Sequence, residues 1–319
     1  MDMVKYTFLL PAYKPDFFEE ALRSIKTQTY TNFKVLVSDD CSPHDLKSIF
    51  DKVCGDDERF AYRRNEQNMG GKSLVAHWNL LVDMCDTEYF ILASDDDIYA
   101  PTFLEEVDKL TIKYPEVDLI RGRCKMFNEK GNIEFYDGIF PEYTNHLEFI
   151  YLMYLPNSIK CMANYVFKLS TFKEDGGFVN FPLAWFSDTA TAIKYGTHGV
   201  ANTPDVLFSF RVSNVNISFS KNDDKKACLK AYAARAYFKW FDDLIKPFEE
   251  NSENLDAWQR GMLSLIEDRH RELVKNELLK YLPNMSFRHL FEYLPSIDER
   301  LYRVYCFLVY IKTKVKRIK

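Results

Sequence analysis

Short apolar runs that end in polar loops recur along the first third of the chain. Residues 6–10, 33–37 and 89–93 each have the length and composition of a buried strand. The segments between these runs carry helical patterns, and strands that alternate with helices favour an α/β fold with a parallel sheet. In such a sheet, ligands bind at the carboxyl ends of the strands. The pattern therefore predicts a binding site where the three runs end.

Carboxylates gather at two of these strand ends. Asp95, Asp96 and Asp97 follow the third run, and Asp39 and Asp40 follow the second. Adjacent buried carboxylates repel one another, whereas a hard divalent cation with oxygen ligands and a bound phosphate would compensate their charge. A solvated acidic turn is the alternative, because ordinary loops also collect aspartates. We expect the two acidic clusters to share one crevice.

Five ordered segments of the chain resemble the nucleotide-binding half of family 2 glycosyltransferases. They are residues 10–13 (LPAY), 24–30 (SIKTQTY), 37–42 (VSDDCS), 68–71 (NMGG) and 94–97 (SDDD). The resemblance implies a GT-A fold, that is, a mostly parallel sheet flanked by helices that binds a nucleoside diphosphate sugar. It also implies a divalent metal ion, Mn²⁺ or Mg²⁺, which bridges the diphosphate and the aspartate motif.

The resemblance implies roles for individual residues of the donor site. Asp40 corresponds to the residue that accepts a hydrogen bond from the base, and a carboxylate suits the N3–H of uracil because it only accepts. Asp95 corresponds to an aspartate on the ribose or metal side, Asp96 to the direct metal ligand and Asp97 to the last position of a D-x-D motif. Which two of them contact the metal stays open. The other donor-site residues that it implies are Pro11, Ala12, Tyr13, Gly70, Gly71 and Lys72. For Lys72, an ordinary surface position is the alternative.

An inverting transfer also needs a carboxylate that takes the proton of the acceptor hydroxyl. Family members place this base in an acidic turn that opens a helix in the second half of the chain, and residues 185–193 match that turn best. Asp188 is therefore the predicted catalytic base. A helix-capping role for Ser187 or Asp188 is the alternative. The aromatic neighbours of Asp188 suit a sugar, because its C–H faces pack on aromatic rings.

Residues 207–218 resemble the arginine-containing strand of the family and the mobile loop that follows it. Arg211 would offer its planar donors to a phosphate of the donor, and a structural ion pair is the alternative. Asn214 stands where many members carry a histidine, which argues against a histidine ligand to the metal or the diphosphate. Residues 213–224 have the polar composition of a lid that excludes water from a transfer site.

Composition is compatible with this interpretation. The chain has 319 residues, of which 47% are apolar and 16% aromatic, which is enough for a large core. Its seven cysteines are scattered without a C-x-x-C pair and are expected to be reduced thiols. A net charge of −5 and the lack of a basic stripe with interleaved aromatic residues in the catalytic half argue against nucleic-acid binding.

Long helical patterns dominate the last third of the chain. They cover residues 226–244 and 254–282, and Pro247 and Pro283 are the expected breaks. We therefore expect a GT-A domain followed by a helical C-terminal appendage. The expected boundaries are residues 1–222 for the GT-A domain, with a nucleotide-binding half at 1–110 and an acceptor half at 111–222, and residues 223–319 for the helical region.

The C-terminal end is first apolar and then strongly basic. Residues 302–311 are aromatic and aliphatic, and five of the eight residues that follow are Lys or Arg. This arrangement suits a peripheral contact with the anionic inner leaflet of a membrane, where lipid-linked acceptors lie. A packed helix with a solvated charged terminus is the alternative. No apolar run reaches the roughly 18 residues of a membrane span, and residues 1–5 lead into a strand rather than a signal peptide, so we expect a cytoplasmic location.

These features together predict an inverting, metal-dependent glycosyltransferase. It would move a hexosyl or N-acetylhexosaminyl group from a UDP-sugar to a hydroxyl of a glycan or lipid-linked saccharide acceptor, in surface polysaccharide synthesis. A nucleotidyltransferase also uses a metal held by aspartates, but the glycine-rich basic loop of that class is absent after Leu10. A partner subunit that keeps the fold and binds nucleotide-sugar without catalysis is the other alternative.

Overall fold

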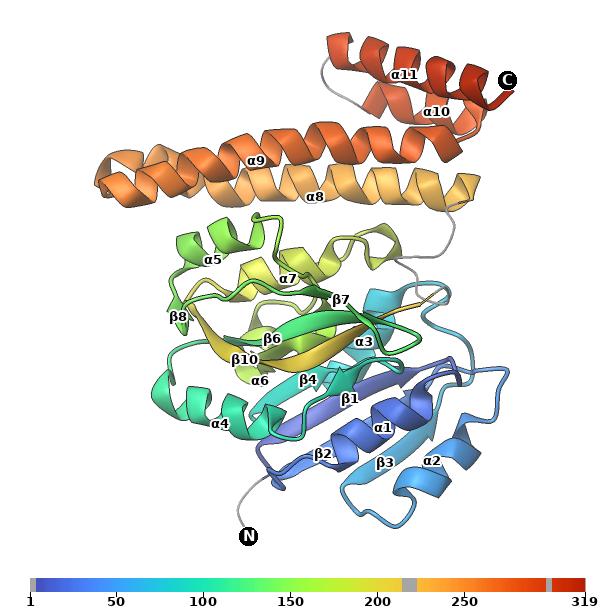
Figure 1. The fold of residues 1–319 in the computed structure, drawn as a ribbon, viewed down its shortest axis with the longest axis vertical. Helices are drawn as coiled ribbons and strands as arrows, with labels where there is room; N and C mark the ends of the chain where they lie inside the picture. Colours follow the sequence, from blue (N-terminus) through green and yellow to red (C-terminus); the bar gives the residue numbers. More distant parts are fainter. Residues whose placement is uncertain (1–3, 214–222, 297–299, 319) are drawn as a thin grey trace. The chain divides into compact units, whose positions relative to one another are not determined.

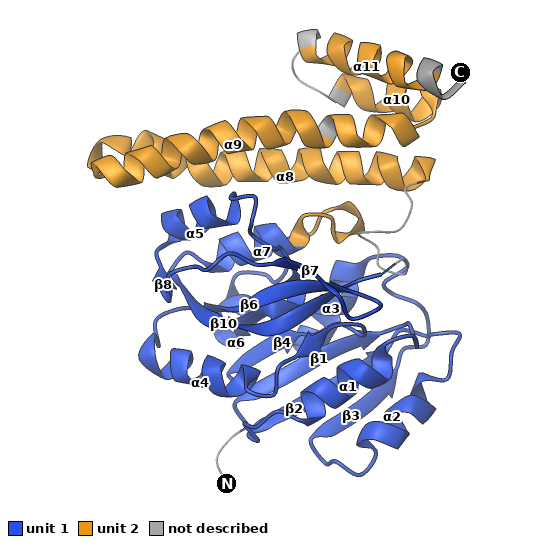
Figure 2. Cartoon of the chain, viewed as in Figure 1, with its two compact units in different colours: residues 1–179, 188–214 blue, residues 180–187, 215–319 orange. Residues whose placement is uncertain are grey.

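The chain divides into two compact units. The structure, a computed structural model, describes residues 4–213, 223–296 and 300–318. Figure 2 shows the two units in different colours; the first comprises residues 1–179 and 188–214, and the second comprises residues 180–187 and 215–319. The short segment 180–187 thus belongs with the C-terminal helices, which the sequence pattern did not predict.

The N-terminal half of the sheet is parallel. β1 (Tyr6–Ala12) pairs in parallel with β2 (Phe33–Asp39) on one side and with β4 (Tyr89–Leu92) on the other, as Figure 1 shows. The three predicted strands are confirmed. β3 (Phe60–Arg64) adds a fourth parallel strand beside β2. Because only Phe60 of this strand is buried, β3 lacks the apolar pattern that marks the other three.

The other half of the sheet mixes strand directions. β9 (Tyr165–Lys168) lies between β4 and β6 (Leu119–Asn128) and is antiparallel to both. β10 (Val200–Val212) runs parallel to β6. β5 (Ile98–Tyr99) pairs with β10 in the antiparallel direction. The full order is β3-β2-β1-β4-β9-β6-β10-β5. The parallel pairing predicted from the three apolar runs holds in the first half of the sheet, and the second half is mixed, because the chain connections, and not the apolar pattern, set strand direction. Two short strands, β7 (Ile133–Tyr136) and β8 (Tyr143–Thr144), pair with β6 and β10.

Helices connect and cover the strands of the first unit. α1 buries Phe18, Leu22 and Ile25, which lie on one face of the helix at the i, i+4, i+7 spacing. α3 begins at Ser73, whose hydroxyl accepts the backbone N–H of Ala76 at 3.2 Å. The helices are α1 (Phe18–Lys26), α2 (Leu46–Cys54), α3 (Leu74–Asp83), α4 (Phe103–Lys113), α5 (His146–Met153), α6 (Leu169–Glu174) and α7 (Ser187–Tyr195).

Aromatic packing holds the loop after β4 in place. The ring of Tyr99, on β5, meets that of Phe8 on β1 at 5.1 Å and that of Phe103 on α4 at 4.9 Å, in both cases edge to face. All three side chains are fully buried. Such aromatic pairs contribute about 0.5–1.5 kcal/mol each beyond the burial of their area. The segment between β4 and β5, which contains Asp95 to Asp97, is therefore anchored at both ends.

The second unit consists mainly of four helices. α8 runs past Pro247 to its end at Glu250, so the break predicted at this proline is wrong. A proline lacks one backbone donor, which removes a single hydrogen bond, and here the helix continues for three more residues. Pro283 does lie at a break, in the short 3-10 turn after α9. The helices are α8 (Asp224–Glu250), α9 (Ala257–Tyr281), α10 (Phe287–Tyr293) and α11 (Arg300–Ile318).

One face of α11 packs within the second unit and another face is exposed. Cys306 and Tyr310 are buried, and the Tyr310 hydroxyl donates to the carbonyl oxygen of Met285 at 3.2 Å. Val304 and Leu308, one turn apart, are more than half exposed. The packed arrangement is thus observed for one face of the helix, whereas a membrane contact through the exposed face stays a prediction. In the described part of the chain, no helix combines the length and the apolar character needed to cross a bilayer.

The cysteines are free thiols, as the scattered pattern predicted. Six of the seven are buried, and Cys41 is partly exposed.

Candidate functional site

The loop after β1 contacts both acidic clusters at the carboxyl edge of the parallel strands. Asp95 Oδ2 accepts the backbone N–H groups of Tyr13 at 2.8 Å and of Lys14 at 2.9 Å. From the other cluster, the hydroxyl of Ser42 donates to the carbonyl oxygen of Tyr13 at 2.7 Å. Parallel pairing places the ends of β1 and β2 side by side, with Ala12 opposite Asp39. The two clusters therefore lie at one edge of the sheet, as the sequence pattern predicted.

Asp40 holds the loop that contains the two predicted glycines. Its Oδ1 accepts from the backbone N–H of Met69 at 2.8 Å and from the side chain of Asn65 at 2.9 Å, while Oδ2 accepts from the backbone N–H of Gly70 at 2.7 Å. A Cβ on residue 70 would lie 2.9 Å from Oδ2, so this contact requires glycine. Three donors occupy three of the about four acceptor positions of a carboxylate. Recognition of a nucleobase through the remaining position stays a prediction.

Asp39, which the sequence singled out only as part of the pair, is structural. Its carboxylate accepts from the backbone N–H of Ser42 at 2.8 Å and from the hydroxyl of Tyr62 at 2.6 Å, and it pairs with Arg64. Its side chain is completely buried. The two adjacent aspartates thus have different tasks, and only Asp40 lies next to the glycine loop.

Asp95 and Asp96 share one cation, the ammonium group of Lys14. Its Nζ lies 2.5 Å from Asp96 Oδ2 and 3.2 Å from Asp95 Oδ1. Burial raises the pKa of the Asp95 carboxyl, and the charge of Lys14 opposes this shift. For Lys14, burial lowers the pKa, but Asp95 and then Asp96 outweigh it and bring the value to about 12. The two carboxylates therefore share a single positive charge.

Asp97 is directed away from this cation. Its Oδ1 accepts the backbone N–H of Arg211 at 2.8 Å, and its Oδ2 accepts from the hydroxyl of Ser94. Burial, followed by the charge of Asp96, raises the pKa of the Asp97 carboxyl. Because both oxygens already have donors within the chain, the metal role predicted for Asp97 has less support here than that of Asp95 and Asp96, and it stays a prediction.

The carboxylates of Asp95 and Asp96 fit a divalent cation. Among the described residues, no group of three or more His, Cys, Asp or Glu side chains is arranged to hold a metal ion. Two oxygens of this pair nevertheless converge on the ammonium of Lys14, which stands in for a cation there. Mg²⁺ usually takes only one or two carboxylates from the protein and completes its shell with water and phosphate oxygens.

Arg211, on β10, is held within the chain. Its side chain is buried, and its guanidinium donates to the carbonyl oxygen of Asp96 at 2.8 Å and to Glu20 Oε2 at 2.7 Å. The rings of Phe17 and Phe127 lie 4.1 Å and 4.5 Å from its central carbon. This geometry is the structural ion pair that the sequence left open as the alternative to phosphate binding.

The remaining predicted donor-site residues are more exposed. Tyr13 is 40% exposed at the carboxyl edge of the sheet. Lys72 is also exposed and donates to Gln67 Oε1 at 2.8 Å, as a surface lysine would. Asn214 and most of the predicted lid at residues 213–224 lie outside the described residues.

Asp188 lies in the first turn of α7 with one free oxygen. Its Oδ1 accepts the backbone N–H of Thr189 at 2.7 Å, and its Oδ2 has no hydrogen-bond partner among the described residues. Burial raises the pKa of the Asp188 carboxyl, while Thr189 and then the charge of Lys160 lower it. A carboxylate with a raised pKa and an accessible lone pair has the properties of a general base.

The backbone that leads into Asp188 adopts unusual conformations. Leu183, Ala184 and Phe186 have φ values of 58°, 53° and 67°. Each left-handed residue other than glycine costs about 1–3 kcal/mol, and such residues cluster at functional sites. Nothing in this segment's residue types signals that conformation. Phe186 itself stacks on Tyr237 within the second unit, with ring centres 4.6 Å apart, so this aromatic neighbour of Asp188 has a packing role.

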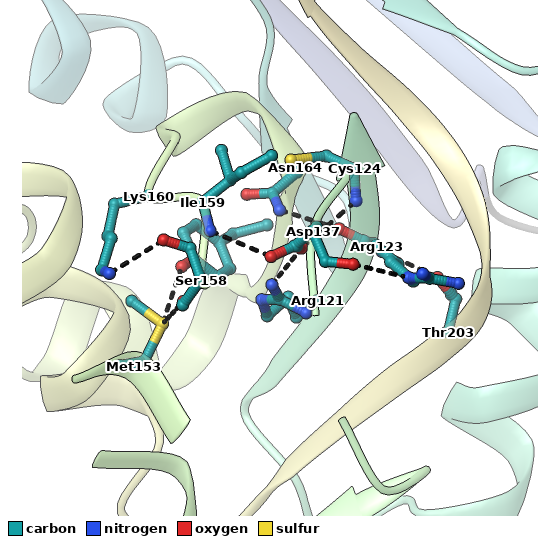
Figure 3. A network of polar contacts seen from close by, with 12 residues as sticks. Arg121, Arg123, Cys124, Asp137, Met153, Ser158, Ile159, Lys160, Asn164 and Thr203 are labelled. Atoms are coloured by element: carbon teal, nitrogen blue, oxygen red, sulfur yellow. Dashed lines mark hydrogen bonds and ion pairs between the residues drawn. The ribbon is translucent and has the colours of Figure 1, made fainter. Parts of the chain in front are cut away.

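A buried polar network supports the segment that carries Lys160 (Figure 3). Arg121, on β6, pairs with Asp137, and both side chains are completely buried. Asp137 Oδ1 accepts the backbone N–H of Ile159 at 2.9 Å, and the ammonium of the next residue, Lys160, donates to the carbonyl oxygen of Ser158 at 2.8 Å. Burial lowers the pKa of Lys160 to about 8, against the charges of Asp137 and Asp188. The sequence analysis missed this network, because its members are far apart in the chain and form no motif.

One side chain connects the two acidic sites electrostatically. Burial raises the pKa of the Cys161 thiol, and the negative charges of Asp97 and Asp188 raise it further. The first unit therefore brings the aspartate motif and Asp188 within electrostatic range of the same residue.

Comparison with known proteins identifies the family. The profile described as Glycosyl transferase family 2 matches residues 7–167, which is just over half of the chain. The chain belongs to this family. The matched region contains β1, the glycine loop and the aspartate motif, but not Asp188.

Curated relatives match only parts of the chain. An uncharacterised glycosyltransferase of Rickettsia conorii is 30% identical over 131 residues, which are 40% of this chain and 20% of that protein. A Campylobacter jejuni protein named GalNAc(5)-diNAcBac-PP-undecaprenol beta-1,3-glucosyltransferase is 29% identical over 96 residues, which are 30% of each protein. The chain thus corresponds to less than a third of the length of either relative.

Solved structures resemble the whole chain. TarS residues 1–349 of S. aureus, in complex with UDP-GlcNAc, match with a TM-score of 0.62 at 16% identity, covering 97% of this chain and 89% of that one. The mannosyltransferase PcManGT of Pyrobaculum calidifontis, in complex with GDP-Man and Mn²⁺, matches with a TM-score of 0.55 at 16% identity, covering 98% and 87%. These likenesses show that the fold is GT-A.

Replacement of one carboxylate tests the metal site. Asp96→Ala should abolish Mn²⁺-dependent binding of UDP, because the cation loses a charged oxygen ligand. The fold should persist, since the substitution removes a repelling charge and no core side chain. Titration calorimetry of UDP with and without Mn²⁺ measures the effect, and Asp51→Ala, an exposed residue of α2, serves as the control. A variant whose UDP affinity still depends on Mn²⁺ as in the wild type would exclude Asp96 as a ligand.

Proposed function

We propose that this chain is an inverting, metal-dependent glycosyltransferase that moves a hexosyl or N-acetylhexosaminyl group from a UDP-sugar to a hydroxyl of a glycan or lipid-linked saccharide. The observation that carries the proposal is the pairing of two sites in one unit. Asp95 and Asp96 converge on one cation, and Asp188 offers a free carboxylate oxygen. Both belong to the first compact unit. An inverting transfer needs a cation at the leaving diphosphate and a base at the acceptor.

The residues divide the work of binding the donor. Asp40 holds the glycine loop through the N–H groups of Met69 and Gly70, which keeps the backbone beside the donor fixed. Tyr13 presents an exposed ring at the same edge, where it can cover the base or ribose. Asp95 and Asp96 would hold the metal ion, which when bound neutralises charge on the diphosphate leaving group.

Asp188 performs the proton transfer in this proposal. Its free oxygen accepts the proton of the acceptor hydroxyl while that oxygen attacks the anomeric carbon from the face opposite the nucleotide. The C–O bond to the acceptor forms, the bond to the diphosphate breaks, and the configuration at the anomeric carbon inverts. Lys160, held by the Arg121–Asp137 network, keeps the carboxylate ionised through its positive charge.

The acceptor side of the proposal includes a membrane surface. The Campylobacter relative is named for a substrate linked to undecaprenol, and such lipids lie in a bilayer. On the second unit, α10 and α11 expose apolar side chains, among which the rings of Phe287 and Phe291 meet at 4.6 Å. Val304 and Leu308 continue this exposed face on α11.

Charge supports an anionic bilayer as the surface that covers this face. Residues 300–319 contain seven Lys or Arg and no Asp or Glu, which gives this segment a net charge of +7. Because the net charge of the whole chain is −5, the remaining residues carry −12. Each basic residue near an anionic bilayer contributes about 1 kcal/mol of attraction. A second copy of the chain would bring the same seven basic residues, whose like charges repel. We therefore propose a peripheral contact of α10 and α11 with an anionic inner leaflet, in the synthesis of a surface polysaccharide.

A non-catalytic subunit that binds nucleotide-sugar is the second candidate. It would share the fold and the donor site, so binding assays do not separate the two. Release of UDP from a UDP-sugar in the presence of Mn²⁺ does separate them, because only a catalyst turns the donor over. The free oxygen of Asp188 favours the enzyme.

Removal of the proposed base tests the chemistry. Asp188→Asn keeps the size of the side chain but removes its proton acceptance, so transfer should fall by roughly 10²- to 10⁴-fold while UDP binding persists. UDP release and calorimetric binding measure the two quantities. Asp175→Asn, which changes a carboxylate at the end of α6, is the matched control. Wild-type turnover in Asp188→Asn would make another carboxylate the base.

The pH dependence of transfer should report the same group. Burial raises the pKa of Asp188, and the base acts only when deprotonated, so kcat should fall as the pH drops through a value above the usual aspartate range. Lys160→Met removes a positive charge and should move this acidic limb to higher pH, whereas Lys160→Arg should leave it in place. An acidic limb that is identical in the wild type and Lys160→Met would argue against Asp188 as the titrating base.

Substitution on the exposed face of α11 tests the membrane contact. Leu308→Glu places a negative charge beside the bilayer and should release the protein from vesicles that contain anionic lipid, because both apolar burial and charge attraction are lost. Ile112→Glu, at an even more exposed apolar position of α4, should not. Vesicle cosedimentation at low and high salt is the measurement, and salt should weaken wild-type binding. Wild-type protein that stays in the supernatant at low salt would refute the contact.

A further inference from the structure

Lys14 contacts the aspartate motif through both its backbone and its side chain. Its N–H donates to Asp95 Oδ2 at 2.9 Å. Its ammonium lies 2.5 Å from Asp96 Oδ2 and 3.2 Å from Asp95 Oδ1. The side chains of the two aspartates are 8% exposed, whereas that of Lys14 is 27% exposed. The ammonium thus covers the solvent side of two buried carboxylates.

The position of the ammonium conflicts with that of a metal ion. A divalent cation bound by Asp95 and Asp96 would need the same oxygens, and two cations so close repel each other strongly when partly shielded from water. The lysine side chain is flexible and carries its charge on a compact group. It can therefore leave the carboxylates, provided that another anion replaces them as its partner.

We propose that Lys14 is a resident counter-ion of the aspartate motif, which a divalent cation displaces and which then pairs with the diphosphate of the donor. This inference rests on the proposed function, in which Asp95 and Asp96 bind the metal. Its consequence is that metal and nucleotide bind together. Without nucleotide, the metal must displace an ammonium that has no carboxylate partner other than Asp95 and Asp96 among the described residues, so the metal alone binds weakly. When nucleotide is bound, the displaced ammonium of Lys14 pairs with the diphosphate.

This linkage is reciprocal by thermodynamic necessity. If UDP raises the affinity for Mn²⁺ by some factor, then Mn²⁺ raises the affinity for UDP by the same factor. A lysine with a purely structural role would act differently, because its loss would weaken both metal and nucleotide binding. The proposal predicts instead that loss of the charge on Lys14 strengthens metal binding and weakens nucleotide binding.

Neutralisation of Lys14 gives the direct test. Lys14→Gln keeps an N–H donor for the carboxylates but no charge. Binding of Mn²⁺ alone, measured by the electron paramagnetic resonance signal of the free ion, should become at least about tenfold tighter than in the wild type. Binding of UDP at saturating Mn²⁺, measured by calorimetry, should become about tenfold weaker, because the diphosphate loses a charged partner. Lys14→Arg should resemble the wild type in both assays.

Lys47→Met is the matched control. Lys47 pairs with Asp51 at the same distance of 2.5 Å, but on the exposed surface of α2, so its loss should change neither affinity. The wild type alone provides a measurement that needs no variant: UDP should raise its affinity for Mn²⁺ at least about tenfold.

Two outcomes would overturn the inference. One is an equal affinity of wild type and Lys14→Gln for Mn²⁺ alone, and the other is a loss of both affinities in the variant. Failure of the proposed function looks different, because the UDP affinity of the wild type would then be indifferent to Mn²⁺.

Discussion

Compensation of buried carboxylates is the constraint on which the catalytic unit depends. Parallel strands end at one edge of the sheet, and the aspartates that follow β2 and β4 are drawn out of water there. Each needs donors, because an unpaired buried carboxylate costs several kcal/mol. Asp40 obtains them from the glycine loop, Asp95 from the loop after β1, and Asp97 from β10. The carboxylates that we propose for donor and metal binding therefore also position the loops around them.

Buried carboxylates near Asp188 also need compensation, and here two of them differ in how much they receive. Both carboxylate oxygens of Asp137 have partners, in Arg121 and in the backbone of Ile159. Asp188 keeps one oxygen free and feels Lys160 only through its charge. A carboxylate that the fold leaves incompletely compensated stays available for a proton. The contrast between Asp137, whose two oxygens have partners, and Asp188, which has one oxygen without a partner among the described residues, is the reason for proposing Asp188 as the base.

The sequence predicted the features that depend on local pattern. The strands β1 and β4 are buried along almost their whole length, β2 buries Phe33, Val35 and Val37, and short motifs mark the loops after all three. The pattern did not reveal β3, which has one buried side chain, nor the mixed direction of the second half of the sheet. It missed Lys14 and Lys160, because a lysine has no sequence signal that distinguishes a counter-ion from a surface charge. Arg211 shows the same limit, since its partners Glu20 and Asp96 are distant in the chain.

The stereochemistry of transfer tests the central claim most directly. Proton NMR can follow the full-length protein with an α-linked UDP-sugar and Mn²⁺ and record which anomer of the sugar forms first, whether on an acceptor or on water. A single displacement assisted by Asp188 predicts that the β-anomer appears first and that the α-anomer grows only later, by mutarotation of the hydrolysed sugar. First appearance of the α-anomer would contradict the account.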